Sequence, residues 1–527
     1  MKITNPARWL CIAAALAAAA CANDLNIVNP NAPDARRALS DPAALEAVAG
    51  GTLHTWFTGY EGMMAVGPLS TIADTYSSSW NNFFMLYINS QDADGTRNTR
   101  PWKNDPGAQE RAHLEWYWTQ YYSVASSASD VLKAIRVDKI VINNAADTKR
   151  AETIAAFMNG AAHSGISMIY NKGYIIDETV DITALTYSNR KQMRDAAVAK
   201  LDAAIALANA NTFTTPAAWT NGRSYTNTQI ARIANTMAAM TLAYYPRDAA
   251  ENATEVDWAR VASYASKGMS TGGAFDFVFV GDGCNQWCHE VLEWFNSIDT
   301  GVIHTRVANL LDPATQKDPY PVGGNKQPNS PDKRLGDGTF GDADLVDGFG
   351  TIPVTATSKP GTDFSYSTYE IFSSSRGQYH QSNIGHIRYD LSRNQDPTGI
   401  YGGYGPAPVM SAGQNDLLWA EALIRGAAPN LAQAATLLNN TRVTRGGLAP
   451  ATAADGVAGL LNILYYEQDV ELLGLGASPF YNRRRLAGGL RPGTPHEMPV
   501  PAKELGVKSE ALYTYGGATN PANSPKP

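Results

Sequence analysis

The sequence predicts a mainly α-helical protein of stacked, tetratricopeptide-like helical hairpins, with an irregular loop-rich insert that carries a few short strands. Two observations lead to this fold class. Long segments on both sides of the insert repeat apolar residues at helical spacing, and these segments come in pairs. Between residues 268 and 409 this periodicity stops, and Gly, Pro, Asp and Ser become common. Because one hairpin cannot bury its apolar face alone, the pairs are expected to stack.

The chain begins with a segment typical of an exported lipoprotein. Lys2 and Arg8 precede an apolar stretch from Trp9 to Ala20, which is too short to span a bilayer. Cys21 follows the small residues Ala18-Ala19-Ala20, so residues 1–20 are predicted to be a lipoprotein signal peptide and Cys21 the lipidated N-terminus. An ordinary secretory signal cut at the same site is the alternative. Residues 21–41 would form the tether, and residues 42–527 a single helical domain.

The first half of this domain is expected to hold most of the helices. Apolar stripes predict helices over residues 42–56, 108–136, 148–171, 189–210, 226–245 and 256–267. The second of these pairs with the third, and the fourth with the fifth, which Pro246 ends. Residues 60–106 are rich in Gly, Ser, Asn, Asp and aromatic residues without periodicity, which indicates a long loop region.

The insert, residues 268–409, contains one strand signal and two cysteines. Alternating apolar residues over 275–280 predict a strand. Cys11 leaves with the signal peptide and Cys21 is lipidated, so Cys284 and Cys288 are expected to form a local disulfide in an oxidising compartment. A haem attachment site is disfavoured because Cys284-x-x-x-Cys288-His289 is one residue longer than the haem c motif. A zinc site is disfavoured because no second pair of ligands at a fitting spacing is present.

The C-terminal segment, residues 410–504, is expected to resume the helical hairpins. Residues 414–426 and 430–442 form one pair, separated by Pro429, and a third helix covers 457–475. Glu421 and Arg442 lie on neighbouring antiparallel helices of this hairpin, and an ion pair between them is the expected role of both.

Short motifs in the C-terminal segment resemble the signature of the SusD/RagB family. They are Ala420-Glu421-Ala422, Asn439-x-x-Arg442-x-x-Arg445-Gly446-Gly447-Leu448, Glu467-x-x-x-Glu471-Leu472-Leu473-Gly474, Arg483-Arg484 and Met498-Pro499-Val500-Pro501-x-x-Glu504. Five such motifs in this order are specific, although each is weak alone. Leu475-Gly476-Ala477 departs from the Glu-Gly-Arg that is usual after the third helix. The resemblance implies a lipid-anchored outer-membrane protein that captures nutrients, usually glycans, for a TonB-dependent, SusC-like transporter.

Motifs for catalysis are not supported by their surroundings. The Gly-x-Ser-x-Gly pattern at residues 268–272 follows a helix and not a strand, and Gly268 fits a helix end better than a nucleophile elbow. The glycine-rich residues 336–341 lack the flanking strand and helix of a dinucleotide site. A net charge of −7 without a basic run argues against a nucleic-acid partner. No catalytic site, metal site or cofactor is therefore predicted.

The candidate ligand-binding residues lie in the aromatic-rich loop region. Trp80 is expected to provide a platform for sugar stacking, Asp74, Asn81 and Asn82 to bind hydroxyl groups, and Trp102 to add a second ring. The expected function is binding of oligosaccharides at the outer membrane, with the lipid-anchored protein facing the exterior. Oligopeptides are the alternative ligand, and an anchored glycoside hydrolase or a structural envelope scaffold is the alternative class, since paired carboxylates cannot be recognised from sequence spacing.

Overall fold

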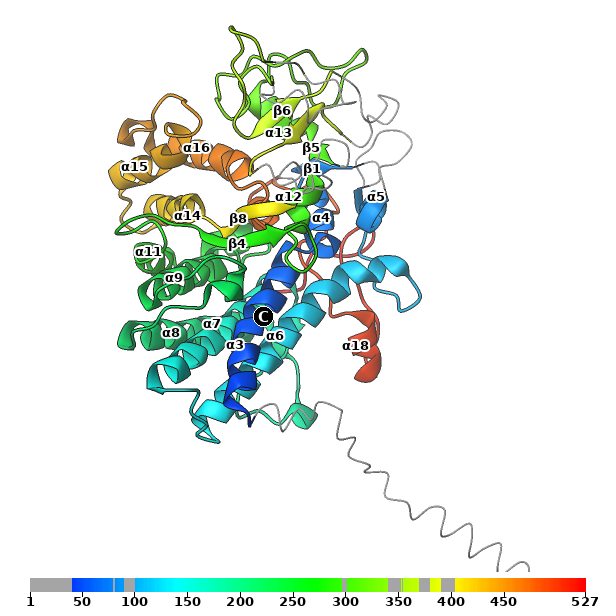
Figure 1. The fold of residues 1–527 in the computed structure, drawn as a ribbon. Coiled ribbons are helices and arrows are strands. Elements are labelled where there is room, and N and C mark those ends of the chain that lie inside the picture. The colour runs from blue at the N-terminus through cyan, green and yellow to red at the C-terminus, as the bar shows by residue number, and fades with distance from the viewer. Residues whose placement is uncertain are drawn as a thin grey trace, which may run out of the picture.

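The structure, a computed structural model, describes residues 40–78, 81–89, 100–295, 301–339, 352, 354–368, 380–389 and 403–527. Helices dominate, and most of the short strands lie in or pair with the insert (Figure 1). The N-terminal helices are α3 (Pro42–Glu61), α4 (Met63–Ile72), α5 (Met85–Asn89), α6 (Ala112–Arg136), α7 (Ala145–Ile169), α8 (Arg190–Ala210), α9 (Asn227–Ala243), α10 (Ala249–Thr254) and α11 (Trp258–Ala265). The later helices are α12 (Glu290–Phe295), α13 (Thr305–Leu311), α14 (Ala412–Arg425), α15 (Leu431–Arg442), α16 (Gly456–Val470), α17 (Ser478–Arg484) and α18 (Ala502–Val507).

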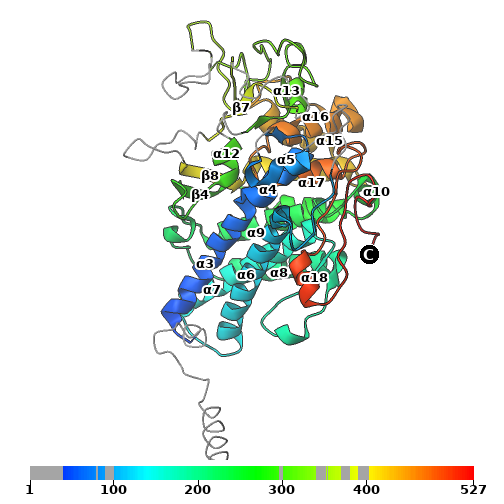
Figure 2. The ribbon, with the colours of Figure 1, turned by 90° about the vertical axis from the view of Figure 1, so that its right-hand side faces the viewer.

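The long helices stack on one another nearly in chain order, which confirms the predicted fold class. Helix α6 packs on α3 and α7, α7 on α8, α8 on α9, and α11 connects α9 to α14 (Figures 1 and 2). Helices α14, α15 and α16 enclose an apolar cluster of their own, built from residues such as Leu417, Leu438 and Leu464. The helical pairs before and after the insert therefore form one continuous stack.

Side-chain caps explain where several of these helices begin. Asn189 and Gln192 form a capping box at the start of α8, each side chain accepting from the other's backbone N–H. Thr226 and Gln229 do the same at the start of α9. These reciprocal bonds satisfy backbone donors that have no partner inside the helix, so they fix the helix boundaries.

The insert is closed by a pair of strands. Strand β4 (Phe277–Asp282) pairs antiparallel with β8 (Tyr404–Met410), with Phe279 opposite Ala407. The β4 ring of Phe279 stacks on Phe57 of α3 at 4.7 Å between centroids, so the base of the insert is packed on the helical stack. The strand predicted at 275–280 is thus present, two residues further along. Three shorter antiparallel pairs join β1 (Tyr76–Ser77) to β5 (Val302–Ile303), β2 (Lys172–Gly173) to β3 (Ser188–Asn189), and β6 (Phe364–Tyr366) to β7 (Ile384–His386).

Within the described ranges, no helix combines the length and the apolarity that crossing a bilayer requires. The predicted signal peptide, Cys21 and most of the tether lie outside the described residues. The export and lipidation of the chain therefore stay predictions.

The predicted ion pair between Glu421 and Arg442 is wrong. Glu421 is fully buried and pairs with Arg485 at 2.5 Å and with Arg425 at 2.7 Å. Arg442 instead donates to the carbonyl of Ala449, which closes the turn after α15. Burial favours the neutral acid, but the two arginines outweigh this effect and lower the pKa of Glu421. Glu421 is thus structural, as expected, but its main partner is Arg485, which follows α17 in the chain.

Glu61, the last residue of α3, is a buried acid. It is 0% exposed, and neither carboxylate oxygen accepts a hydrogen bond from the described part of the chain. Burial raises the pKa of Glu61 well above its ordinary value of 4.5, and the nearby Glu290 raises it further. The folded state therefore binds this proton more tightly than the unfolded chain does. The stabilising contribution is complete below the unfolded pKa and is lost as the pH rises through the folded pKa.

Glu61→Gln is consequently expected to raise the melting temperature at a pH of about 8 and to change it little at a pH of about 4. At the higher pH, Glu61 of the unfolded wild type is ionised, so folding must either bury this charge or take up a proton. Glutamine has neither cost. Thermal unfolding of both proteins across this range measures the difference. An equal change at both ends of the range would contradict the assignment, since a simple packing effect does not depend on pH.

Candidate ligand-binding face

An exposed tryptophan and a half-buried phenylalanine meet where α12 lies beside the segment before α5. Trp294 of α12 is 36% exposed, and its ring contacts Phe83 edge to face at 5.7 Å between centroids. Phe83 belongs to the short 3₁₀ helix η1 (Asn82–Phe84), and both views place α12 close to α4 and α5 (Figures 1 and 2). We call Asn81, Asn82, Phe83 and Trp294 the aromatic face.

Two of the predicted site residues lie on this face. Asn81 is exposed and Asn82 half-buried, and neither side-chain amide bonds to another described residue. Both amides are therefore available to a ligand. Trp80, the predicted platform, lies outside the described residues. Trp294 was missed by the sequence analysis, although a signal exists: Val291, Leu292 and Phe295 form the buried side of α12, which leaves Trp294 on the other side.

The other two predicted site residues are buried, which corrects the prediction. Trp102 is 2% exposed and its indole N–H donates to the carbonyl of Glu497 at 2.9 Å. Asp74 is 3% exposed and its carboxylate lies 3.1 Å from Nε of Arg491. An aromatic ring in the core cannot stack on a sugar, and a carboxylate already engaged in the interior is not a surface acceptor for hydroxyl groups. Both residues were predicted to be exposed because residues 74–102 show no helical or strand periodicity and so no obvious core face.

Asp74 instead anchors the chain just before the aromatic face. Nδ1 of His304 accepts from the backbone N–H of Arg306 at 3.0 Å, so the ring proton sits on Nε2, 3.3 Å from Oδ1 of Asp74. Arg306 donates from Nε to the carbonyl of Asp74 at 3.0 Å and forks onto Asp469 of α16 at 2.7 and 2.9 Å. Such bidentate pairs fix geometry. The segment leading to the aromatic face is therefore held from two sides.

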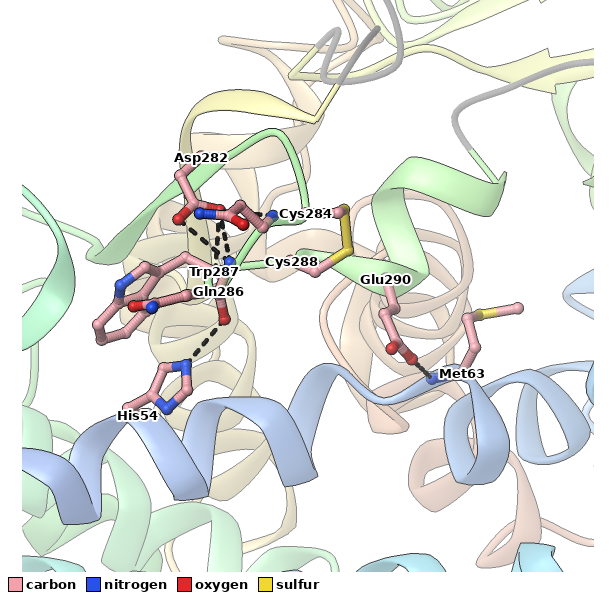
Figure 3. The surroundings of a disulfide bond; sticks show 9 residues. His54, Met63, Asp282, Cys284, Gln286, Trp287, Cys288 and Glu290 are labelled. Carbon is pink, nitrogen blue, oxygen red and sulfur yellow. Dashed lines mark hydrogen bonds between the residues drawn. A yellow bond between two sulfur atoms is a disulfide. The ribbon is translucent and has the colours of Figure 1, made fainter.

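The disulfide loop holds the other side of the face. Cys284 and Cys288 are joined by a disulfide, and α12 begins two residues later (Figure 3). Asp282 Oδ1 accepts from the backbone N–H groups of residues 285, 286 and 287 at 3.0 to 3.1 Å, which folds the loop upon itself. The loop is thus a compact unit between β4 and the helix that carries Trp294.

Two contacts fasten this unit to the N-terminal helices. Nε2 of His54 on α3 donates to the carbonyl of Gln286 at 2.8 Å, and the His54 ring meets Trp287 edge to face at 4.4 Å (Figure 3). The backbone N–H of Met63 on α4 donates to Oε2 of Glu290 at 2.7 Å. The first turn of α12 is therefore tied to the start of α4.

In the described parts of the chain, no group of three or more His, Cys, Asp or Glu side chains is arranged to hold a metal ion.

Solved structures share this architecture along most of the chain. A SusD-like carbohydrate-binding protein from Bacteroides vulgatus is 14% identical, with a TM-score of 0.54 and coverage of 86% of each chain. A SusD homologue from Bacteroides thetaiotaomicron is 11% identical, with a TM-score of 0.54, and the match covers 92% of this chain and 99% of that one. The chain has the SusD fold. A SusD-like carbohydrate-binding protein from Bacteroides fragilis, 12% identical over 85% of this chain and 86% of that one, gives the same TM-score.

No family model matches the sequence, and no curated protein matches it. The resemblance inferred from the C-terminal motifs is nevertheless confirmed for the fold, because these SusD-like structures match 86% and 92% of the chain. Within this SusD fold, helix α12, which carries Trp294, lies on the insert side of the molecule, next to α4 (Figure 1). The regular helices supply a rigid support, and short irregular segments supply the exposed side chains.

Proposed function

We propose that this protein is an outer-membrane lipoprotein that binds oligosaccharides through the aromatic face and delivers them to a TonB-dependent transporter. The observation that carries the proposal is the exposed Trp294 ring, supported from below by the half-buried Phe83, on a SusD fold. Two of the similar solved structures are named carbohydrate-binding proteins. The lipoprotein-type N-terminus and the C-terminal motifs support anchoring and delivery.

The chemistry of the aromatic face suits a sugar. The apolar face of a pyranose ring stacks on an indole, and hydroxyl groups accept from and donate to amides such as those of Asn81 and Asn82. A preorganised site loses less conformational entropy on binding. Both segments of the face meet this condition, one through Asp74 and Arg306, the other through the disulfide loop.

Trp294→Ala is expected to weaken glycan binding by about 1–3 kcal/mol, or roughly 5- to 150-fold in Kd, because a central aromatic contact is lost. Calorimetry of the purified mature protein against a panel of neutral oligosaccharides measures this. Trp219→Ala is the matched control: it removes the same side chain, but Trp219 packs beside Gly50 in the first half of α3. Its Kd should equal that of the wild type.

Three other outcomes would change the proposal. An unchanged Kd in Trp294→Ala, for a glycan that the wild type binds, would exclude Trp294 from the site. Binding of oligopeptides with no binding of any glycan would move the ligand class to peptides. Shortening of the oligosaccharide during the titration, detected by mass spectrometry, would replace the binding protein with a glycoside hydrolase.

A further inference from the structure

A polar cavity lies on the helical stack, away from the aromatic face. It has a volume of about 420 Å³ and opens between the second half of α8, the first half of α9 and the end of α11. These three helices lie side by side on the opposite flank of the molecule from α5 (Figure 1). The glycan site proposed above does not use this cavity. The side chains that line the cavity therefore have to indicate which ligand it binds.

Arg232 of α9 brings a positive charge to the cavity without a carboxylate partner. Its Nε donates to the carbonyl of Gly268 at 3.0 Å, and Nη2 donates to the carbonyls of Met269 and Gly273 at 2.6 and 2.8 Å. The guanidinium also lies 4.8 Å from the ring centre of Phe275. All of these partners are neutral, and burial lowers the pKa of Arg232 with no acid to offset it. The charge is held in place but not compensated within the described chain.

The remaining polar lining adds more donors than acceptors. Lys267 is exposed at the rim, and its ammonium group makes no hydrogen bond or ion pair with the described residues. Asn209, Asn235 and Thr228 in the first turn of α9 also line the cavity, and a helix N-terminus favours negative charge. The Asn235 amide already donates to the carbonyl of Ala231 at 2.7 Å. Asp202 is the acid in the lining, and its Oδ1 already accepts from the hydroxyl of Tyr264 at 2.7 Å. Asp202 keeps its negative charge, but its Oδ2 lies 3.6 Å from the guanidinium of Arg260. Arg232 and Lys267 therefore have no carboxylate partner within the described residues.

We propose that this cavity binds a carboxylate of a peptide segment, and so serves as a docking site for a partner protein. Arg232 and Lys267 would bind the carboxylate, and Ile205 with Ala231 would contact the adjoining aliphatic side chain. A sugar acid fits less well, because the Tyr264 ring, the one aromatic surface in the lining, already lies under the guanidinium of Arg260 at 5.6 Å. The carboxylate can come from a chain end or from an acidic side chain.

Calorimetry with short peptides at low salt tests the proposal on the full mature protein. N-acetyl-Ala-Ala-Val with a free carboxylate is the first probe, its C-terminal amide the second, and amidated N-acetyl-Ala-Asp-Val the third. We expect at least one of the two carboxylate peptides to bind about tenfold or more tightly than the neutral amide, because a charge-assisted contact is lost in the amide. The stronger of the two identifies the source as chain end or side chain. Salt should weaken this binding.

Lys267→Glu should reduce the affinity for the carboxylate peptide by about tenfold or more, and leave glycan affinity unchanged. Lys267 is exposed, so the fold should tolerate the change. Lys191→Glu on the first turn of α8 is the matched control, with the same change in net charge outside the cavity. Equal binding of acid and amide, equal loss in Lys267→Glu and Lys191→Glu, or binding of galacturonate without either peptide would overturn the proposal.

Discussion

Arg334→Met is expected to lower the free energy of unfolding by about 3–5 kcal/mol, because it leaves buried carboxylates without their cation. Arg334 is 0% exposed, and its guanidinium lies 2.7 Å from Asp332, 2.8 Å from Glu467 and 3.1 Å from Glu471. Burial disfavours the charged form, but Glu467 and Asp332 raise the pKa of Arg334 above its ordinary value. Glu471 keeps Arg388 and Arg445 in the variant, whereas Asp332 and Glu467 lose their shared cation.

Urea unfolding followed by circular dichroism measures this loss. Lys333→Met is the control, since it removes one positive charge from the neighbouring, exposed residue, and it should shift the free energy by no more than about 0.5 kcal/mol. Arg334→Lys should fall between the two, because it keeps the charge but not the fork that reaches three carboxylates. Similar losses in the two Met variants would mean that net charge, and not the buried network, accounts for the effect.

The helical scaffold was predictable because its signals are local. Apolar residues at helical spacing define α6 and α7 within one stretch of chain, and a hairpin of neighbouring helices needs no information from elsewhere. The alternation around Phe277 likewise indicated strand β4. The cysteine pair followed from counting, since Cys284 and Cys288 are four residues apart. In each case, the sequence pattern and the structure it forms lie in the same segment.

The contacts that build the site are not local, so they could not be predicted in the same way. Trp102 bonds to Glu497, almost four hundred residues away, and an aromatic residue in a loop region gives no indication of such a partner. Asp74 is engaged by Arg491 and His304, which come from two other parts of the chain. Trp294 could have been found from the apolar pattern of α12, but that helix has only six residues, fewer than two turns, which is too few to establish a period.

A buried arginine forms a similar long-range contact in the C-terminal part of the helical stack, at α14. Glu421 of α14 is reached by Arg485, just after α17, through two contacts of 2.7 and 2.5 Å. Arg485 is 0% exposed and also donates to Asn482 at 2.8 Å. Gln468 of α16 donates to the same carboxylate at 3.1 Å. One carboxylate therefore connects three helices that are separated in sequence.

Arg485→Met is expected to lower the free energy of unfolding by about 3–5 kcal/mol, because Glu421 stays buried and loses its bidentate partner. Arg425→Met is the control: Arg425 contacts the same carboxylate once, at 2.7 Å, donates to the hydroxyl of Tyr465 at 2.7 Å, and has a side chain that is 20% exposed. Glu421 keeps Arg485 in this variant, so the loss should be smaller, about 1–2 kcal/mol. Urea unfolding of both variants gives the comparison. Glu421→Leu combined with Arg485→Met should recover part of the loss, because it removes the unpaired charge itself, and a double variant less stable than Arg485→Met would contradict this explanation.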